Sequence, residues 1–376
     1  MTDDPLFESF DLDGLDLDNR VGLAPMTRTS ATDDGHATDE MARYYAKFAE
    51  GGFSFLVTEG IYTDTDHSQG YANQPGLATD EQADSWEPVV DRVHDAGAPV
   101  FAQLMHAGAL VQGNRWTDET VGPSAVRPKG EQLEMYGGEG QFAEPQELST
   151  DELDGIRETF VVAAERAAEA GFDGVEVHGA NGYLLDQFLT AYTNQRDDEY
   201  GGDVESRVRF PTEVLQAVAD ATPDGFVVGV RLSQSKVNDP DYRWEGEAEA
   251  EAVFDAFSAA GADYLHVTEA DVTAPAFEGD AGDTGDGGNE TDATLAELAA
   301  EYGDAPVVAN GGLEDPEAAR ATVEAGADLI TLGTGALANP DWPTRVENDE
   351  PLADLDFERV LQPDASIDDS EVPSDD

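Results

Sequence analysis

The feature that most constrains the fold of this chain is a regular alternation of short apolar runs with longer helical segments. The runs are rich in Val, Ile, Leu and Phe and are nearly continuous, which is typical of parallel strands buried on both faces. There are eight of them, and they span residues 21–27, 53–60, 100–106, 174–178, 226–233, 264–269, 306–312 and 329–335. The fold therefore has to bury eight strands together.

The segments between these runs are predicted to be helices. They open on Ser, Asp or similar capping residues, and several close on Gly just before the next strand; they span residues 39–52, 80–97, 149–171, 203–220 and 315–328. Strand alternating with helix eight times predicts an α/β fold of the (β/α)8 TIM-barrel class. A doubly wound open sheet remains the alternative, because periodicity alone does not show closure.

Two connections are long, and both follow the C-terminal ends of strands, which form the catalytic face of such barrels. Residues 107–148, after the third strand, carry scattered Gly and Pro and are expected to hold a hairpin or a cap. Residues 270–290, after the sixth strand, are a Gly/Asp-rich loop. We expect one domain over residues 1–361 and a disordered acidic tail over residues 362–376.

Charge is the most unusual property of the composition. There are 82 Asp and Glu residues against 19 Lys and Arg, a formal net charge of −63. Because the apolar runs persist along nearly the whole chain, we expect a folded domain with a carboxylate-rich surface rather than disorder. At ~1 M salt the screening length falls to ~3 Å and the surface repulsion largely vanishes. We therefore expect a cytoplasmic protein of a salt-accumulating, halophilic organism.

Several other classes of protein are disfavoured. The alternative to a halophilic protein is an acidic protein that mimics or repels nucleic acid. In either case, binding to nucleic acid or to an anionic membrane is disfavoured. The absence of cysteine excludes disulfides, thiolate zinc sites and iron–sulfur clusters. The histidines show no metal-ligand spacing, so no metal is expected. No signal peptide and no apolar run of ~18 residues is visible, so no membrane span is expected.

Polar or glycine residues stand where the eight predicted strands end. In a barrel these ends converge on one mouth, so they predict a polar site on an apolar scaffold. The site is neutral to basic in an acidic protein, which favours an anionic ligand, and the glycines of the last two strands are where a phosphate binds in this architecture. The ends are Thr27, Glu59-Gly60, Gln103 with His106, His178, Arg231, Thr268-Glu269, Asn310-Gly311-Gly312 and Gly333-Thr334.

The same segments carry a resemblance to a known family. The motifs "APMTR" (24–28), "VTEG" (57–60), "FAQLMHAG" (101–108) and the long stretch from "GFDGVEVHGANGYLLDQF" to "ESRVRF" (171–210) resemble the Old Yellow Enzyme family of flavin-dependent ene-reductases. The resemblance spans about residues 5–346. It implies a non-covalently bound FMN in the barrel mouth, NADPH or NADH as reductant, and an enone or enal as the small-molecule substrate, with the two half-reactions alternating.

The resemblance also implies the residues that bind the cofactor. The backbone of Ala24, Pro25 and Met26 would lie against the flavin and Thr27 at its carbonyl edge. Gly60 and Gln103 would bind the pyrimidine ring, and Arg231 would face the N1/O2 edge, where reduction leaves negative charge. The phosphate would be held by Gly311, Gly312, Gly333 and Thr334. Many members have Arg where this chain has Thr334, so a charge-assisted contact is lost and FMN binding is weaker unless another cation compensates.

The catalytic residues implied by the resemblance are His178, Asn181 and Tyr183. His178 and Asn181 would donate hydrogen bonds to the carbonyl oxygen of the substrate, stabilising the enolate-like charge as hydride reaches the β-carbon. Tyr183 would protonate the α-carbon as a general acid.

Some assignments stay open. His106 is expected to support Gln103 or the flavin. Loop aromatics are expected to contribute to the substrate pocket: Tyr62, Tyr71, Trp116, Tyr136, Tyr242 and Trp244. The alternatives for function are a related flavin barrel acting on amines or dienoyl thioesters and a non-catalytic flavin protein. The sequence leaves open the physiological substrate and whether the protein forms a homo-oligomer.

Overall fold

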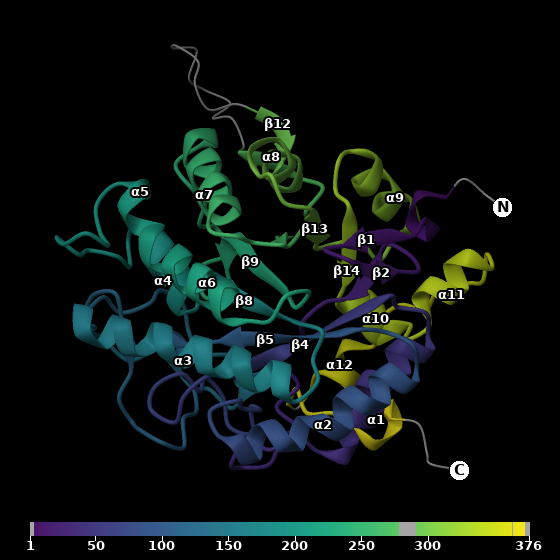
Figure 1. The fold of residues 1–376 in the computed structure, drawn as a ribbon, viewed down its shortest axis with the longest axis horizontal. Coiled ribbons are helices and arrows are strands. Elements are labelled where there is room, and N and C mark those ends of the chain that lie inside the picture. Colours follow the sequence, from purple (N-terminus) through teal and green to yellow (C-terminus); the bar gives the residue numbers. More distant parts are fainter. Residues whose placement is uncertain (1–3, 278–290, 363, 373–376) are drawn as a thin grey trace.

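Eight parallel strands close into a barrel, with helices around it (Figure 1). The structure is a computed structural model that describes residues 4–277, 291–362 and 364–372. Strand order around the barrel follows the chain, and the last strand pairs with the first, so the closed barrel is confirmed over the open sheet. The strands are β3 (Val21–Leu23), β4 (Phe55–Tyr62), β5 (Val100–Met105), β8 (Gly174–Asn181), β9 (Val227–Lys236), β10 (Tyr264–Thr268), β13 (Val307–Asn310) and β14 (Leu329–Leu332).

Helices follow the strands and cover the outside of the barrel. The predicted helices are present, but the segment 203–220 forms two helices. Pro211 lacks the N–H that a continuous helix needs. Because the second helix begins at Arg209, Pro211 lies in its first turn, where that N–H is not required. None of the helices in the described ranges is long and apolar enough to cross a membrane. The main ones are α1 (Asp39–Glu50), α2 (Asp80–Asp95), α3 (Thr150–Glu169), α4 (Leu184–Leu189), α5 (Val204–Arg207), α6 (Arg209–Ala221), α7 (Glu247–Ala259), α8 (Leu295–Tyr302), α9 (Pro316–Glu324), α10 (Thr334–Ala338), α11 (Trp342–Glu347) and α12 (Phe357–Val360).

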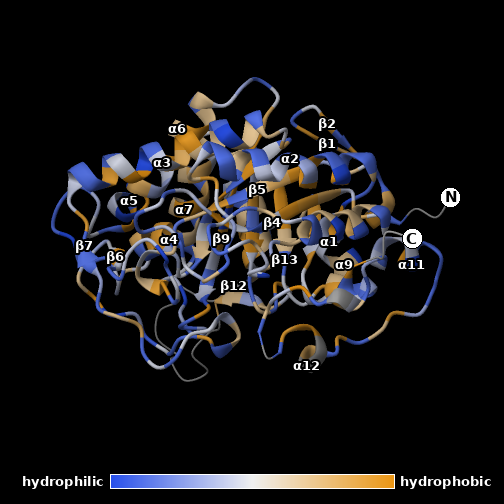
Figure 2. Cartoon of the chain, turned by 90° about the horizontal axis from the view of Figure 1, so that it is seen from below, coloured by the Kyte–Doolittle hydropathy of each residue, from blue (hydrophilic) through white to orange (hydrophobic). Residues whose placement is uncertain are grey.

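The N-terminal end of the barrel is closed by apolar packing. A hairpin of β1 (Phe10–Leu12) and β2 (Leu15–Leu17) places Leu12 and Leu17 against an inner layer made of Phe55, Phe101, Val227, Tyr264, Val308 and Leu329. Apolar colour is concentrated on the strands and on the inner sides of the helices in Figure 2, with hydrophilic residues outside. With this end filled, a ligand has access to the interior from the opposite, C-terminal end.

Both long loops lie at that C-terminal end, and the first of them was expected to hold a hairpin or a cap. The loop after β5 holds β6 (Val121–Gly122) and β7 (Gln146–Glu147), which pair in parallel, so they are not a hairpin. The loop after β10 holds the antiparallel strands β11 (Pro275–Phe277) and β12 (Thr291–Thr294). The rest of that predicted loop, residues 278–290, lies outside the described residues.

Residues 364–372 of the predicted tail are described, and they contact the body of the barrel. A short 3-10 helix spans Asp369–Glu371. The fully buried Arg28, just after β3, donates to the Glu371 carboxylate at 2.6 and 3.0 Å and to the carbonyl oxygens of Ala365 and Ser366. Lys47 of α1 donates to the carbonyl oxygen of Glu371. Two cations from elsewhere in the chain therefore fix this segment, which an acidic composition alone does not reveal.

Candidate active site

A cavity of about 370 Å³ opens at the C-terminal end of the barrel. Its size is within the usual range for small-molecule and cofactor sites. Every predicted cofactor-binding and catalytic residue lines it: Ala24, Pro25, Met26, Thr27, Gly60, Gln103, His178, Asn181, Tyr183, Arg231, Gly311, Gly312, Gly333 and Thr334. Below, the side-chain end of the cavity means His178, Asn181, Tyr183 and Arg231, and the glycine end means Gly311, Gly312, Gly333 and Thr334.

A buried polar layer lies directly beneath the site. Side chains two residues apart on a strand share a face, so Glu176 points into the barrel below His178. The fully buried Glu176 carboxylate accepts hydrogen bonds from Gln103 Nε2 at 2.8 Å and from the Tyr264 hydroxyl at 3.1 Å, and His266 Nδ1 lies 2.6 Å from it. Burial opposes its charge, but His266, Arg231 and Gln103 outweigh burial and lower the pKa of Glu176 to about 2. A carboxylate is an obligatory acceptor, so Gln103 must turn its carbonyl oxygen towards Gly60 and the cavity.

Arg231 is a buried cation with unused donors. Its Nη2 donates to Thr268 Oγ1 at 2.9 Å and to Asn310 Oδ1 at 2.7 Å. Within the described residues, its Nε and Nη1 have no hydrogen-bond partner. Burial lowers its pKa to about 10 while Glu176 opposes the shift, so the guanidinium stays charged at neutral pH. Two orphaned donors on a buried charge call for an acceptor-rich, anionic ligand group.

His178 is neutral in this setting. Burial, and secondarily the nearby charge of Arg231, lowers the pKa of His178 to about 3. A neutral imidazole carries one N–H and one acceptor nitrogen, and Nδ1 has no partner in the described protein. The ring can therefore donate one hydrogen bond to a substrate oxygen without adding a full positive charge.

Tyr183 stands beside this imidazole and belongs to a group of three phenols. The centres of the His178 and Tyr183 rings are 5.0 Å apart. The Tyr183 hydroxyl is hydrogen-bonded to the hydroxyl of the buried Tyr71, and Tyr136 packs on Tyr71 with ring centres 4.6 Å apart. Burial raises the pKa of Tyr183, although the Tyr71 contact opposes this. The phenol therefore keeps its proton at neutral pH, as a proton donor requires.

Backbone rather than side chains forms the glycine end. Gly311 has φ +127°, and a Cβ there would lie 1.9 Å from the Glu269 carbonyl oxygen, so only glycine fits. Thr334 opens α10 and supplies a hydroxyl at this end. Among the described residues that line the cavity, Arg231 is the one Lys or Arg. A cation that compensates for Thr334 is therefore not found among them.

Several residues singled out from the sequence lie away from the cavity wall. Of the six aromatic residues expected to contribute to the substrate pocket, Tyr136 alone is among the described residues that line the cavity. The expectation is wrong for the other five. His106 is buried outside the described lining of the cavity, and its Nδ1 accepts a hydrogen bond from the Gly108 N–H. The Glu59 carboxylate accepts from the N–H groups of Arg28 and Thr29 and so holds the loop after β3.

Sequence reasoning missed both the layer below the site and part of the rim. Glu176 had a usable signal, because it stands two residues before His178 on one strand. The apolar lining residues Leu133, Val237, Leu313, Leu337 and Leu361 had none, since they come from loops and from helix α10, far apart in the chain, whereas Met105 lies in the predicted third strand.

The residues present fit FMN. The orphaned Nε and Nη1 of Arg231 suit the electron-rich N1/O2 edge of an isoalloxazine, and the fixed carbonyl oxygen of Gln103 suits a pyrimidine N–H. The glycine end leaves space and backbone N–H groups for a phosphate. When bound there, FMN supplies the redox chemistry, accepting hydride from a nicotinamide and passing it to a substrate.

Comparison with known proteins agrees with this chemistry. Residues 5–353 match the model of the NADH:flavin oxidoreductase / NADH oxidase family. The chain is 33% identical over 367 residues to 12-oxophytodienoate reductase 2 of Arabidopsis thaliana, covering 93% of this chain and 90% of that protein.

Solved structures are similar over the same length. The Old Yellow Enzyme homologue from Zymomonas mobilis has a TM-score of 0.82 at 31% identity, covering 93% of this chain and 94% of that one. Morphinone reductase in complex with tetrahydroNAD has a TM-score of 0.79 at 30% identity, covering 98% and 99%. The chain thus belongs to the NADH:flavin oxidoreductase / NADH oxidase family, among the homologues of Old Yellow Enzyme, and is an FMN-dependent ene-reductase that uses NAD(P)H.

Proposed function

We propose that the side-chain end of the cavity binds an α,β-unsaturated carbonyl compound by its oxygen and protonates its α-carbon. The observation that carries this proposal is the convergence of a neutral His178, Asn181 and a protonated Tyr183 on one cavity. His178 and Asn181 donate to the carbonyl oxygen and stabilise the charge that develops there. Tyr183 delivers a proton to the carbon that the hydride does not reach.

The rest of the cavity positions the cofactor for that step. Backbone at Ala24, Pro25 and Met26 forms a wall for the ring system. Gly60 and Gln103 take its pyrimidine side, and Arg231 offers a permanent charge at N1/O2. The glycine end holds the phosphate through backbone N–H groups and the Thr334 hydroxyl.

NADPH oxidation with and without 2-cyclohexenone tests the activity. We expect the purified, FMN-containing protein to consume NADPH faster when the enone is added, and to form the saturated ketone in equal amount. A phenol should give a long-wavelength absorption band by binding the same oxygen donors. Enone-independent NADPH consumption without ketone formation would contradict the proposal.

The acidic surface leads to a second proposal, that the enzyme works in the salt-rich cytoplasm of a halophile. A net charge of −63 repels itself in dilute buffer and is screened at ~1 M salt. We expect fold and activity to require roughly molar KCl or NaCl, measured by circular dichroism and NADPH oxidation across a salt series. Full stability in dilute buffer would contradict it.

A further inference from the structure

The turn that carries Asn181 and Tyr183 is strained and is tied down at each residue. Asn181 has φ +63° and Gly182 φ +89°. Asparagine tolerates such a φ better than most residues, but it does not prefer it. The Asn181 N–H donates to Ser233 Oγ at 2.9 Å, and the Gly182 N–H donates to Asp186 Oδ2 at 2.7 Å. The position of the Asn181 carboxamide therefore depends on Ser233 and Asp186.

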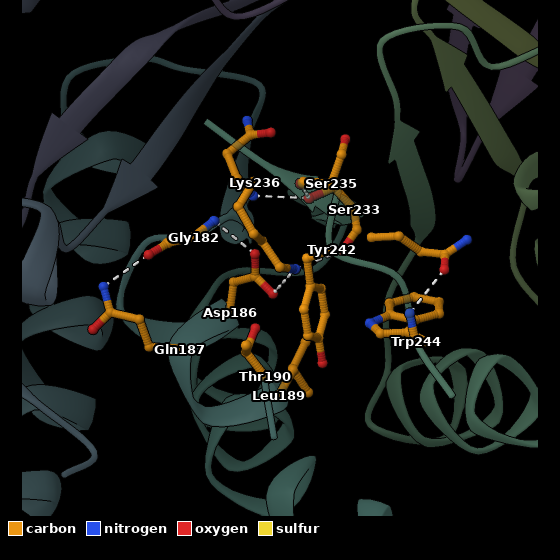
Figure 3. Close-up of polar contacts among 12 residues, drawn as sticks. Gly182, Asp186, Gln187, Leu189, Thr190, Ser233, Ser235, Lys236, Tyr242 and Trp244 are labelled. Carbon is orange, nitrogen blue, oxygen red and sulfur yellow. Dashed lines mark hydrogen bonds and ion pairs between the residues drawn. The ribbon is translucent and has the colours of Figure 1, made fainter. Parts of the chain in front are cut away.

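One lysine contacts both residues that supply these acceptors, Asp186 by its carboxylate and Ser233 by its backbone (Figure 3). Lys236, at the end of β9, donates from Nζ to Asp186 Oδ1 at 2.6 Å and to the carbonyl oxygen of Ser233 at 3.1 Å. It is also the register partner of Asn181 between β8 and β9, beyond the point where the register shifts. The Lys236 ammonium thus lies between the two groups that hold the strained turn.

This ion pair is out of contact with solvent. The side chains of Lys236 and Asp186 are 1% and 0% exposed. The Tyr242 ring covers the ammonium, with Nζ 5.0 Å from the ring centre. Burying such a pair contributes little net stability, since desolvation offsets the attraction. Neither residue lines the active-site cavity, so the pair touches no substrate there.

We propose that Asp186 and Lys236 are positioning residues that hold the Asn181 carboxamide at the substrate oxygen. The inference rests on the proposed role of Asn181 as an oxygen donor. Asp186 accepts a hydrogen bond from the Gly182 N–H, and Lys236 donates to both Asp186 and Ser233. Without the pair, the turn relaxes towards negative φ and Asn181 leaves the site, while His178 stays on its strand.

A double-mutant cycle on phenol binding tests this inference. The pair is replaced as Lys236→Met with Asp186→Leu, which leaves no uncompensated charge and no acceptor for the Gly182 N–H, and Leu has the same branched shape as Asp. We expect the variant to retain FMN and to bind the phenol about tenfold more weakly, the loss of one ordinary hydrogen bond. Adding Asn181→Ala to this variant should then weaken binding little further, because that donor has already left.

The outcomes separate this inference from the proposed function. If Asn181→Ala weakens phenol binding equally with and without the pair, the pair does not act through Asn181 and the inference is overturned. If Asn181→Ala has no effect in the wild-type protein, the proposed function fails instead. A pair variant that does not fold is replaced by Lys236→Met with Asp186→Asn, which is also uncharged but keeps an acceptor for Gly182; its coupling to Asn181→Ala should be smaller and of the same sign, and strict additivity overturns the inference there too.

Lys129 provides a matched control. It lies 2.7 Å from Asp239 in an ion pair whose lysine side chain is 57% exposed. Its partner Asp239 is bonded to Lys236 through the backbone, so the control lies close to the turn. Lys129→Met removes the same charge and leaves those backbone bonds and the Asp186–Lys236 contact in place. We expect its phenol affinity to equal that of the wild type, and a loss like that of the buried pair would overturn the inference.

Discussion

The two ends of the active-site cavity recognise their ligands by different means. At the side-chain end, Arg231, His178 and Tyr183 are buried, and each has its protonation state set by its surroundings. At the glycine end, backbone N–H groups and one hydroxyl are available, and Gly311 has no room for a Cβ. The chemistry of the side-chain end can thus be altered by isosteric substitutions. Recognition at the glycine end depends instead on the path of the backbone.

The largest effect expected at the side-chain end comes from Tyr183→Phe. Removing the proton donor should slow reoxidation by an enone by up to ~10²–10⁴, while NADPH-driven flavin reduction stays nearly unchanged. Stopped-flow absorbance separates the two half-reactions, with Tyr192→Phe, outside the cavity, as control. Loss of flavin reduction with normal enone turnover would reverse the assigned roles.

Arg231→Met should have the next largest effect. The charged donors towards the flavin are lost, while Thr268 and Asn310 still bond to each other at 2.8 Å and Glu176 keeps its contacts with Gln103, Tyr264 and His266. FMN affinity should fall by about 10- to 100-fold, with slower flavin reduction, and Arg231→Lys should rescue it partly, because it lacks the planar fork. Fluorescence titration of the apoprotein with FMN measures the affinity. Wild-type affinity in both variants would show that Arg231 does not contact the flavin.

Thr334→Arg tests whether the glycine end gains from a charge. At the lowest salt concentration at which the fold is retained, it should tighten FMN binding by about tenfold through a charge-assisted contact with the phosphate. The gain should shrink towards molar salt as the contact is screened. The control is Thr117→Arg, which adds the same charge outside the cavity. Equal gains in the two variants would show that the effect is net charge and not a contact.

The smallest expected effect is an absence of titration at His178. Its pKa of about 3 lies below the ordinary histidine value, so the imidazole stays neutral between pH 5 and 8. The affinity for two phenols of different acidity should then follow each phenol's own pKa. If the affinity of both phenols instead changed near pH 6.5, His178 would gain a proton in the site and would act as a cationic donor.

The barrel and the residues around its mouth were predictable because the relevant signals are local. Each strand is a continuous apolar run, and the residue that ends it is next in sequence. The buried layer was not predictable in the same way: the charge of Glu176 is stabilised by Gln103, His266 and Arg231, and Gln103 lies 73 residues away. The described tail escaped prediction for a similar reason, since its partner Arg28 lies 343 residues from Glu371.

The Arg28–Glu371 contact has a consequence for the order in which the protein matures. At ~5–20 residues per second, ribosomal synthesis needs roughly 20–70 s to cover the 343 residues between them. Until then Arg28, next to Thr27 of the cavity wall, lacks its carboxylate partner, and a buried cation without one is strongly unfavourable. We infer that the mouth of the barrel is completed late, after all eight strands have left the ribosome.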